Sequence, residues 1–361
     1  MKKIILTGGG TAGHVSGNMA LVPELKKHGF NIDYIGTHRG MERDIVASDK
    51  DIIYHPISAG KFVRGFHPGN IKDAFKVLKG IKEASKLVKE IKPDVVFSKG
   101  GFVTVPVVIA AHRHHVPVII HESDFTPGLA NKISAEFADK ICTTFPETVS
   151  MFRNKKRNGA SSVICTGAPL RKELFAGSRS TGYSLCGFAD NKPVIIVMGG
   201  SLGAQAINKL IRESVNVLVK KYNIIHICGR GGCDNALNIQ GYKQFDYVTT
   251  ELPHLFAISD IAVSRAGSNA IFEFLAAQIP MLLIPLPKGE SRGDQILNAD
   301  SFAKSGFAVT KYQENLDPQE LCKDIDALFA DKQKFRTAMH NSSIQNGTDN
   351  ILKLIYSCCT K

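Results

Sequence analysis

The same local pattern opens each half of this 361-residue chain: a short run of β-branched apolar residues, a cluster of glycines, and then a helical stretch. The letters are "KKIILTGGGTAGHV" from Lys2 and "PVIIVMGGSLGAQAIN" from Pro193. A strand followed by a glycine turn and a helix is the opening unit of a doubly wound α/β domain. Its repetition predicts two such domains, and it constrains the fold more than any other feature of the sequence.

Short apolar runs alternate with longer helical patterns along both halves, which is typical of a parallel sheet with helices on both faces. In the first half we expect strands at Lys3–Thr7, Ile32–Ile35, Asp94–Ser98, Pro117–His121 and Lys140–Thr143, and helices that include Ala20–His28 and Ile71–Ile91. In the second half we expect strands at Val194–Met198, Ile224–Ile227, Tyr247–Thr249, Ile261–Ser264 and Met281–Ile284, and helices that include Ala204–Lys220 and Asn269–Ala277. The fold class is therefore α/β.

The alternation is interrupted at about residues 153–193, a stretch rich in Asn, Gly, Ser and charged residues. Such a composition is typical of a linker, so the domain boundary is placed there. We expect a first domain over residues 1–165, a second over 166–345 and, over 346–361, a C-terminal helix that packs back on the first domain. Ligands would lie in a cleft between the domains, at the carboxyl ends of the strands.

The net charge of +12 is concentrated in the first half of the chain. Residues 1–170 contain 24 Lys and Arg against 15 Asp and Glu, whereas the remainder contains 21 against 18. A basic first domain favours nucleic acid, a membrane surface or a phosphorylated substrate as partner, although any single lysine is best explained as solvated surface. No apolar run is long enough for a membrane span or a signal peptide, so we expect a cytoplasmic protein. None of the eight cysteines forms a C-x-x-C pair, which argues against a zinc site or a disulfide framework.

Gly8, Gly10 and Gly13 have the G-x-G-x-x-G spacing of a dinucleotide-binding turn, in which backbone N–H groups approach a diphosphate. A nicotinamide enzyme also needs an acidic residue at the end of the second strand, where it binds the ribose. Here Asp33 falls inside that strand and Thr-His-Arg occupies 37–39 at its end, so a dinucleotide-dependent oxidoreductase is a weak alternative.

His14 follows this glycine turn directly and should lie on the first turn of the helix. The positive end of the helix disfavours the imidazolium form, so a neutral imidazole is expected there. A neutral imidazole can act as a general base. The simpler alternative is a histidine that hydrogen-bonds to the backbone.

Further polar clusters follow predicted strands in both halves. The segment "HESDFTPG" contains His121, Glu122 and Asp124; each could simply cap a helix, but the three together favour a polar site. In the second half, Ser201 lies in the glycine turn and Gln295 follows a polar loop. Glu273 lies near a predicted helix start, where its carboxylate could bind both hydroxyls of a ribose or simply face solvent.

A metal-dependent nucleotide-sugar transferase often binds its metal through an Asp-x-Asp pair. That spacing occurs at Asp49–Asp51 and Asp324–Asp326, but neither pair follows a predicted strand at the expected cleft. Both pairs are expected to be solvated turn or helix residues. We therefore predict no bound metal and no cofactor.

Five segments occur in the order, and at spacings, similar to those of one enzyme family: "GGGTAGHV", "SKGGFVTVPV", "HESDFTPGLANK", "GGSLGAQAIN" and "SRAGSNAIFEFLA…PMLLIPLPKGESRGDQILNA". On these motifs the chain resembles, over essentially its whole length, the MurG family of N-acetylglucosaminyltransferases, in particular its Firmicutes branch. The resemblance implies a GT-B fold, in which two Rossmann-like domains face a cleft. It also implies UDP-N-acetylglucosamine (UDP-GlcNAc) as donor and lipid I, the undecaprenyl-diphosphate-linked muramyl-pentapeptide, as acceptor. Transfer with inversion would give lipid II for peptidoglycan.

The resemblance further implies roles for individual residues. His14 is the usual candidate for the base that takes the acceptor proton, and Glu122 is the alternative. Glu273 would bind the ribose hydroxyls, Arg171 would lie near the donor diphosphate, and Asp124 stands where the family often has asparagine. The implied substrate-binding positions are Thr11, Ala12, Gly13, Asp124, Arg171, Ser201, Thr249 (backbone to the uracil), Ser268, Asn269, Ala270, Ile271, Phe272, Glu273 and Gln295 (sugar hydroxyls).

Because the acceptor is a membrane lipid, the resemblance implies a peripheral protein on the cytoplasmic face of the cell membrane. Phe62, Val63 and Phe66 lie beside Arg64 and other basic residues, a composition that suits an anionic inner-leaflet surface. The alternative is an ordinary loop that precedes an amphipathic helix. Proteins of cell-wall synthesis and cell division are further expected partners, and nucleic acid is not.

A UDP-N-acetylglucosamine 2-epimerase is the main alternative function, because it shares the two-domain architecture. Such an enzyme needs no membrane surface, so the basic and apolar loop argues weakly against it. A non-catalytic binding module is the least favoured function, since polar clusters are expected on both sides of the cleft.

Overall fold

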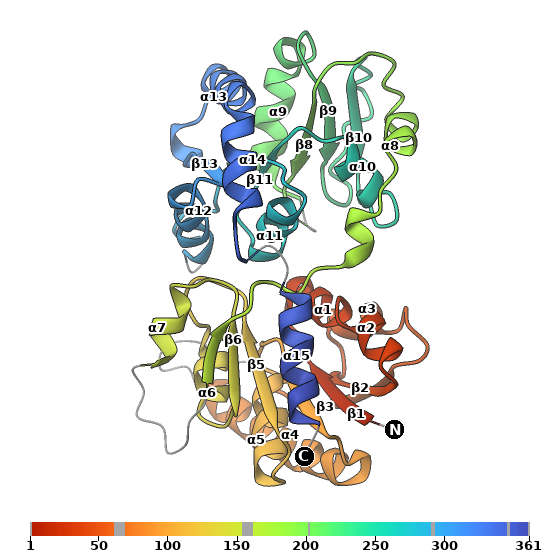
Figure 1. Cartoon of the computed structure of the whole chain (residues 1–361), viewed down its shortest axis with the longest axis vertical. Coiled ribbons are helices and arrows are strands. Elements are labelled where there is room, and N and C mark those ends of the chain that lie inside the picture. The colour runs from red at the N-terminus through yellow and green to blue at the C-terminus, as the bar shows by residue number, and fades with distance from the viewer. Residues whose placement is uncertain are drawn as a thin grey trace. The chain divides into compact units, whose positions relative to one another are not determined.

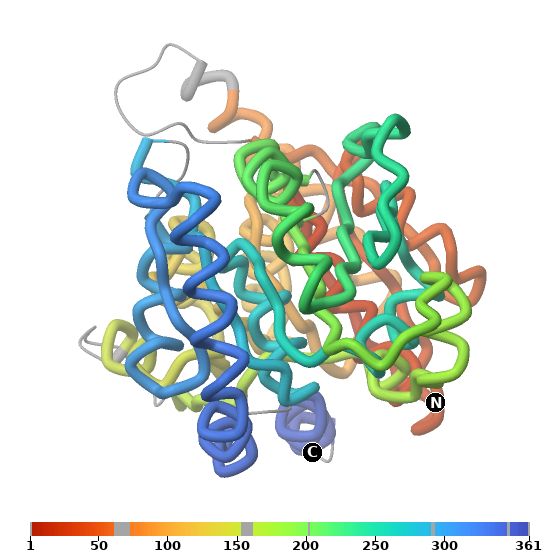
Figure 2. Tube along the Cα trace, turned by 90° about the horizontal axis from the view of Figure 1, so that it is seen from above, coloured from red at the N-terminus to blue at the C-terminus, as the bar shows by residue number. Residues whose placement is uncertain are grey.

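The computed structural model describes residues 2–60, 69–153, 162–200, 203–289, 293–344 and 347–359, which Figure 2 traces in colour. The chain divides into two compact units (Figure 1). Unit 1 comprises residues 1–171 and 346–361, and unit 2 comprises residues 172–345. The chain therefore passes between the units twice, and unit 1 is built from two separate stretches of sequence.

Within the described residues, unit 1 contains a seven-stranded parallel sheet with the order β3-β2-β1-β4-β5-β6-β7. Its strands are β1 (Lys2–Thr7), β2 (Phe30–Thr37), β3 (Ile53–Ile57), β4 (Val95–Ser98), β5 (Val118–Glu122), β6 (Lys140–Thr143) and β7 (Ser162–Cys165). Its helices are α1 (Ala12–Met19), α2 (Val22–Lys27), α3 (Met41–Val46), α4 (Gly69–Ile91), α5 (Thr104–Arg113), α6 (Leu129–Ser134), α7 (Thr148–Arg153) and α15 (Thr348–Cys358). Thr7 pairs with Ser98, and Ser98 pairs with Ile120, so the loops after β1, β4 and β5 begin side by side.

Each face of this sheet packs against its own apolar core. One core joins the sheet to α1, α2, α3 and α15, and the other joins it to α4, α5 and α7. Strands β4 and β5 are buried at every position, because helices cover them on both sides. This is the doubly wound arrangement that the alternating pattern predicts.

Helix α15 returns to unit 1 after the chain has passed through unit 2 (Figure 1). Ile351 and Ile355 are fully buried in the core that also contains Ile4 of β1. The start of α15 is held by Thr348, whose hydroxyl donates to Leu170 O at 3.0 Å and accepts from Leu170 N–H at 2.9 Å. The two passages between the units thus leave unit 1 from adjacent points.

Within the described residues, unit 2 contains a six-stranded parallel sheet with the order β10-β9-β8-β11-β12-β13. Its strands are β8 (Val194–Met198), β9 (Asn223–Ile227), β10 (Tyr242–Phe245), β11 (Ile261–Ser264), β12 (Met281–Leu283) and β13 (Ala308–Thr310). Its helices are η1 (Lys172–Phe175), α8 (Arg179–Cys186), α9 (Gln205–Leu218), α10 (Leu252–Ile258), α11 (Ser268–Ala276), α12 (Asp294–Lys304), η2 (Gln313–Asn315), α13 (Pro318–Ala330) and α14 (Lys332–His340). Met198 pairs with Ser264, and Ser264 with Leu283, so the loops after β8, β11 and β12 are neighbours.

The expected strand Tyr247–Thr249 is wrong. The strand lies earlier, at Tyr242–Phe245, where it pairs with β9, and residues 247–249 form the loop that follows it. Tyr247 is half-exposed, and its ring lies 5.2 Å from the guanidinium carbon of Arg230. Tyr247 and Val248 suggested a strand, but the tyrosine is explained by its cation–π contact and does not belong to the sheet.

Candidate active site

The first glycine turn joins β1 to α1 and positions His14. Thr11 caps the helix, since its hydroxyl oxygen accepts from His14 N–H at 3.4 Å, and Ala12 and Gly13 begin the first turn. His14 Nδ1 lies 2.9 Å from Gly9 O. Because a carbonyl oxygen only accepts, Nδ1 carries the proton of the neutral ring, and Nε2 is its basic nitrogen.

The glycine turn after β4 packs directly against the turn after β1. Gly9 N–H donates to Gly100 O at 3.3 Å. Gly101 has a φ of +95°, and a Cβ built on it would overlap Gly9 O, so this position requires glycine. The two turns therefore present backbone at the carboxyl edge of the sheet, where a diphosphate could approach closely.

Glu122, at the end of β5, is buried and organises the loop that follows it. Its Oε1 accepts from Asp124 N–H at 3.0 Å, and its Oε2 accepts from Gly128 N–H at 3.0 Å and from Asn131 Nδ2 at 2.9 Å. Burial and the neighbouring Asp124 carboxylate raise the pKa of Glu122, whereas these three donors oppose the rise. Asp124 itself is half-buried on this loop.

Lys99 and His121 lie beside Glu122 and are both fully buried. Lys99 Nζ is 2.9 Å from His121 Nδ1 and also hydrogen-bonds to Ser123 Oγ. Burial lowers the pKa of Lys99 to about 8, and burial together with the Lys99 ammonium holds the pKa of His121 well below its usual range. Sequence reasoning placed His121 only in the polar cluster after its strand and gave Lys99 no role. The signal available was the run of glycines after Lys99, which indicates crowded backbone there.

Glu42, from α3, is a second buried carboxylate that sequence reasoning missed. Its Oε1 accepts from Thr37 N–H at 2.9 Å and from Thr37 Oγ1 at 2.6 Å, and a Cβ on Gly9 would lie 3.0 Å from its Cδ. An acidic side chain therefore does reach the end of β2. Glu42 is completely buried and hydrogen-bonds to Thr37, so this carboxylate stabilises the turn and is not accessible to the ribose of a nicotinamide cofactor.

In unit 2, the expected donor residues on α11 follow β11. The N-cap residue of this helix is Gly267, which makes no side-chain cap hydrogen bond. Ser268 is buried, and Asn269, Ala270 and Glu273 are half-buried. Ile271 and Phe272 are fully buried core residues, so only their backbone could face a ligand.

The other expected site residues are placed as follows. Gln295 lies on the first turn of α12, and its Oε1 accepts from Leu286 N–H at 3.1 Å. Thr249 is exposed before α10, and its N–H donates to Glu251 Oε2 at 3.0 Å. Arg171 is the last residue of the first stretch of unit 1. Ser201 and the expected membrane residues Phe62, Val63, Arg64 and Phe66 lie outside the described residues.

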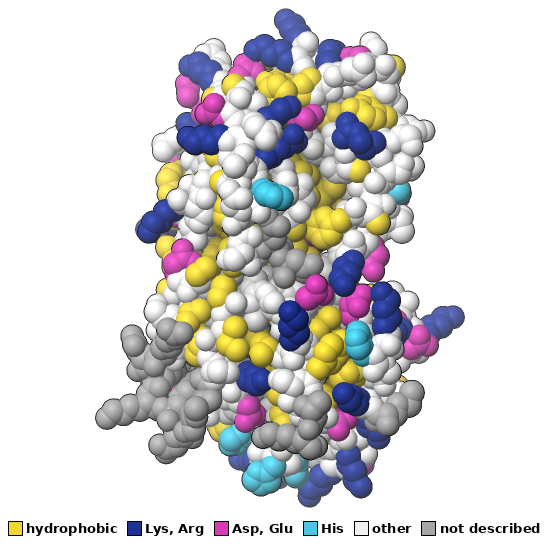
Figure 3. All heavy atoms as spheres, viewed as in Figure 1, with side chains coloured by type: hydrophobic (Ala, Val, Ile, Leu, Met, Phe, Trp, Pro, Cys, Tyr) yellow, Lys and Arg dark blue, Asp and Glu magenta, His cyan; other side chains and the backbone are white. Residues whose placement is uncertain are grey.

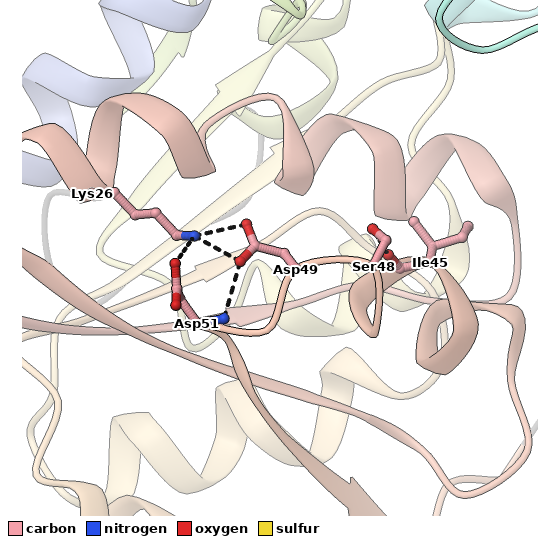
Figure 4. Close-up of polar contacts among 5 residues, drawn as sticks. All are labelled: Lys26, Ile45, Ser48, Asp49 and Asp51. Carbon is pink, nitrogen blue, oxygen red and sulfur yellow. Dashed lines mark hydrogen bonds and ion pairs between the residues drawn. The ribbon is translucent and has the colours of Figure 1, made fainter.

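Both Asp-x-Asp pairs are bound by lysines. Figure 4 shows the first pair with Lys26. Lys26 Nζ lies 2.6 Å from Asp49 Oδ1 and 2.8 Å from Asp51 Oδ2, and these two carboxylates raise the pKa of Lys26 against the opposing effect of burial. In the second pair, Lys311 binds Asp324 at 2.8 Å and Lys221 binds Asp326 at 2.6 Å. The described residues contain no group of three His, Cys, Asp or Glu side chains arranged to hold a metal ion.

Both units match domains of one enzyme family. Residues 4–143 match the glycosyltransferase family 28 N-terminal domain, and residues 194–355 match the glycosyltransferase family 28 C-terminal domain. The chain belongs to glycosyltransferase family 28, and its two Rossmann-like domains are those of a GT-B fold.

Curated relatives match nearly the whole chain. The UDP-N-acetylglucosamine--N-acetylmuramyl-(pentapeptide) pyrophosphoryl-undecaprenol N-acetylglucosamine transferase of Clostridium novyi is 54% identical over 98% of each chain. The protein of the same name in Clostridium tetani is 52% identical and covers 98% of this chain and 97% of its own. These relatives confirm the family resemblance predicted from the five motifs.

Two solved structures share the fold at lower identity. MurG of Acinetobacter baumannii aligns with a TM-score of 0.75 at 24% identity and covers 99% of this chain and 100% of its own. UDP-GlcNAc 2-epimerase of Neisseria meningitidis, bound to UDP-GlcNAc, aligns with a TM-score of 0.68 at 14% identity, over 99% and 100%. The fold alone therefore does not separate a transferase from an epimerase, whereas the names of the relatives do.

Proposed function

We propose that this enzyme transfers N-acetylglucosamine from UDP-GlcNAc to lipid I, with inversion at the anomeric carbon, and so makes lipid II for peptidoglycan. The observation that carries the proposal is the match to transferases of that name at 51–54% identity over 98% of the chain. The geometry of each unit supports one half of this reaction.

The helix ends of unit 2 support the binding of the UDP donor. Helices α9, α11 and α12 begin after the neighbouring strands β8, β11 and β12, and their N-cap residues, Ala204, Gly267 and Gly293, make no side-chain cap hydrogen bond. The positive ends of helices favour a diphosphate and stabilise it as it leaves. On the half-buried second turn of α11, Glu273 would accept the ribose hydroxyls, and Gln295, oriented by Leu286 N–H, would present its amide N–H groups to the sugar.

His14 is the better candidate for the catalytic base. Its Nδ1–H is directed at Gly9 O, which leaves Nε2 as the nitrogen that can take a proton. Both oxygens of Glu122 already accept hydrogen bonds from the loop, so we assign that residue the role of holding the loop. In the reaction, the acceptor 4-hydroxyl oxygen attacks the anomeric carbon, the bond to UDP breaks, UDP keeps the electron pair and His14 Nε2 receives the hydroxyl proton.

The lipid acceptor requires contact with the inner leaflet of the membrane, where we place the enzyme as a peripheral protein. Among the described residues, no helix has the length and apolar character needed to cross a bilayer. The face drawn in Figure 3 mixes basic with acidic side chains over both units and offers no dominant basic surface. Helix α4 exposes apolar side chains instead: Phe75 and Leu78 are 68% and 58% exposed. The exposed Lys76 and Lys79 lie beside them and form ion pairs with Asp73 and Glu83 of the same helix. Exposed apolar side chains with lysines beside them can enter the interface of an anionic bilayer.

The test is a transfer assay with labelled UDP-GlcNAc and a short-chain analogue of lipid I. We expect labelled N-acetylglucosamine in the lipid product, one UDP released for each transfer, and no change in the donor when the acceptor is omitted. Conversion of UDP-GlcNAc to its 2-epimer in the absence of acceptor, without transfer in its presence, would identify an epimerase and reject the proposal.

A further inference from the structure

Lys99 occupies a site shaped to hold it. Its side chain runs from the end of β4 beneath α1, and a Cβ built on Gly17 of that helix would overlap Lys99 Cε. Glycine inside a helix is less stable than alanine, so its presence at residue 17 is explained by the room that it leaves for the lysine. Lysine is among the residues that are least often fully buried, and such placement calls for a specific partner.

That partner is His121, and the contact fixes which ring nitrogen carries the proton. The Lys99 ammonium has hydrogens to donate and no acceptor, so His121 Nδ1 accepts at 2.9 Å. The opposite nitrogen, Nε2, lies 3.1 Å from Gly167 O, a group that only accepts, so Nε2 carries the hydrogen. The neutral Nε2–H tautomer satisfies both contacts at once, whereas the Nδ1–H tautomer would satisfy neither.

Gly167 lies where both passages between the units leave unit 1. It has a φ of +81°, and a Cβ on Gly347 would overlap its carbonyl oxygen. Gly347 N–H in turn donates to Ala168 O at 2.8 Å. The residues at 167–168 and at 347 therefore pack without side chains between them, and the hydrogen bond from His121 is a side-chain anchor at this junction.

We propose that Lys99 is a positioning residue for the transfer reaction: it holds His121 as the Nε2–H tautomer, and His121 thereby anchors the Gly167 carbonyl at the junction of both passages. The buried amine thus links the loops of the acceptor unit to the points from which the chain enters and leaves unit 2. Only the kinetic part of the test below rests on the proposed function, because the state of the histidine ring is measured without substrates.

The direct test is long-range 1H–15N NMR on the full chain labelled with 15N-histidine, with the His121 signals assigned by their loss in His121→Gln. In the wild type we expect His121 Nε2 to carry the proton. Lys99→Met retains the length of the side chain and removes the donor to Nδ1. Only the Gly167 carbonyl then favours the Nε2–H tautomer, so we expect part of the population to carry the proton on Nδ1. Lys50→Met, which removes an exposed lysine of the same unit, is the matched control and should leave the His121 signals unchanged.

Gly17→Ala tests the same link with the lysine still present. The added methyl group should push the flexible end of Lys99 away from His121 and change the tautomer as Lys99→Met does. In the double variant Gly17→Ala, Lys99→Met, the effect of Gly17→Ala should largely disappear, because the amine that it displaces is gone. Since alanine favours the helix, this variant also answers the question if Lys99→Met fails to fold.

Two functional measurements follow from the loss of the anchor. Amide exchange at Gly347 and Leu170 should become roughly tenfold faster, which corresponds to one lost buried hydrogen bond. The turnover number for transfer should fall about 10- to 100-fold, because the loops of the acceptor unit no longer hold the acceptor in the orientation needed for attack. UDP affinity should not change, because the donor site is not affected. If His121 keeps the Nε2–H tautomer in both Lys99→Met and Gly17→Ala, the proposal is wrong, whatever the activity. If the tautomer changes while turnover and amide exchange do not, the link exists but the positioning role is rejected.

Discussion

Unit 1 and unit 2 each bury a cation at the same place in their sheets. Lys99 directly follows β4 and Arg265 directly follows β11, and these strands lie next to the first strands of the two sheets, β1 and β8. The local sequences, "SKGG" and "SRAG", are alike. Arg265 is 6% exposed, and it donates at 3.1 Å to the carbonyl oxygens of Ile284 and Pro285, which follow β12.

The difference between the two cations lies in what they bind. Arg265 holds backbone carbonyls with a guanidinium that does not lose its proton in proteins, so its contacts are the same at every working pH. Lys99 binds a histidine nitrogen and a hydroxyl, and its own proton is lost much closer to neutrality. At the same position in the fold, Arg265 thus remains charged and holds backbone carbonyls in the proposed donor unit, whereas Lys99 belongs to a titratable cluster in the proposed acceptor unit. The predictions below test this division.

The largest effect is expected at His14. If the proton chemistry belongs to unit 1, His14→Ala should lower the turnover number by about 10²–10⁴, because the acceptor hydroxyl loses its base. UDP affinity should change little, since the donor binding groups are assigned to unit 2. Steady-state kinetics and calorimetry with UDP measure the two quantities. His28→Ala, at an exposed histidine of the same unit, is the control, and near-normal turnover in His14→Ala would transfer the base role to Glu122 or to solvent.

The next largest effect is a pH dependence of stability that Lys99 confers and Arg265 does not. The folded protein releases the Lys99 proton at a pKa of about 8, whereas the unfolded chain keeps it to 10.5. Between these values the unfolded state binds more protons, so this group makes the free energy of unfolding rise with pH, by about 3 kcal/mol in total. Below pH 8 that contribution is absent.

The measurement is the difference in unfolding free energy between the wild type and Lys99→Met at pH 7.5 and pH 10. The difference cancels groups that do not interact with Lys99. Cys142 is not one of them, because burial raises its pKa to about 12 and the Lys99 ammonium lowers it, so both proteins are compared in a Cys142→Ala background. As pH rises, the free energy of unfolding of the wild type should increase relative to that of Lys99→Met. The difference between the wild type and Arg265→Met should not change with pH. Parallel pH profiles for the wild type and Lys99→Met would show that the amine keeps its proton and that the two cations are equivalent.

A smaller effect is expected from Glu273 in unit 2. Loss of a charge-assisted hydrogen bond to the ribose amounts to about 1.5–3 kcal/mol, so Glu273→Ala should weaken UDP binding roughly tenfold or more. Calorimetric titration with UDP checks this, with Glu213→Ala on the exposed side of α9 as control. Unchanged UDP affinity would remove Glu273 from the donor site and leave unit 2 without a carboxylate role.

The smallest effect is expected from the surface of unit 1. Phe75→Ser with Leu78→Ser on α4 should loosen binding to anionic vesicles several-fold, because the variant loses apolar burial while the basic residues remain. Activity on a short-chain, soluble acceptor should survive, and activity on long-chain lipid I should fall. Phe175→Ser, at an exposed phenylalanine of unit 2, is the control. Equal sedimentation of wild type and variant with vesicles, or equal loss of both activities, would exclude this surface as the membrane contact.

Interior and edge strands differ in how well the sequence predicts them. The interior strands of both sheets were found, because helices on both faces require nearly continuous apolar runs, as in Val194–Met198. The edge strands are β3, β7, β10 and β13; β10 was misplaced and the other three were missed. Edge strands are partly exposed: β7 has no buried residue, and β3 buries only Ile57. Without a buried face, neither alternation nor a continuous apolar run marks such a strand.

The parts of the candidate site that are formed by local backbone turns could be predicted from the sequence. The buried side chains of the site could not. Glycine turns and helix starts are local features, so the loops after β1, β5, β8 and β11 were located from sequence alone. Lys99 was not singled out, because its burial depends on Gly17 and His121, which are distant in sequence. Glu42 reaches the end of β2 from the following helix, a direction that spacing within the strand cannot indicate.

The return of α15 to unit 1 has a consequence for how the polypeptide acquires its structure during synthesis. The core of unit 1 includes Ile351 and Ile355, so it cannot close until a ribosome has made and released residues beyond 355. Unit 2 is continuous over residues 172–345 and has all its strands before that moment. The half of the protein that is translated second is therefore able to finish folding first, while the nascent β1–β7 segment waits with part of one face uncovered. Exposed apolar surface in a waiting segment of this kind is where misassembly and chaperone binding are expected to concentrate.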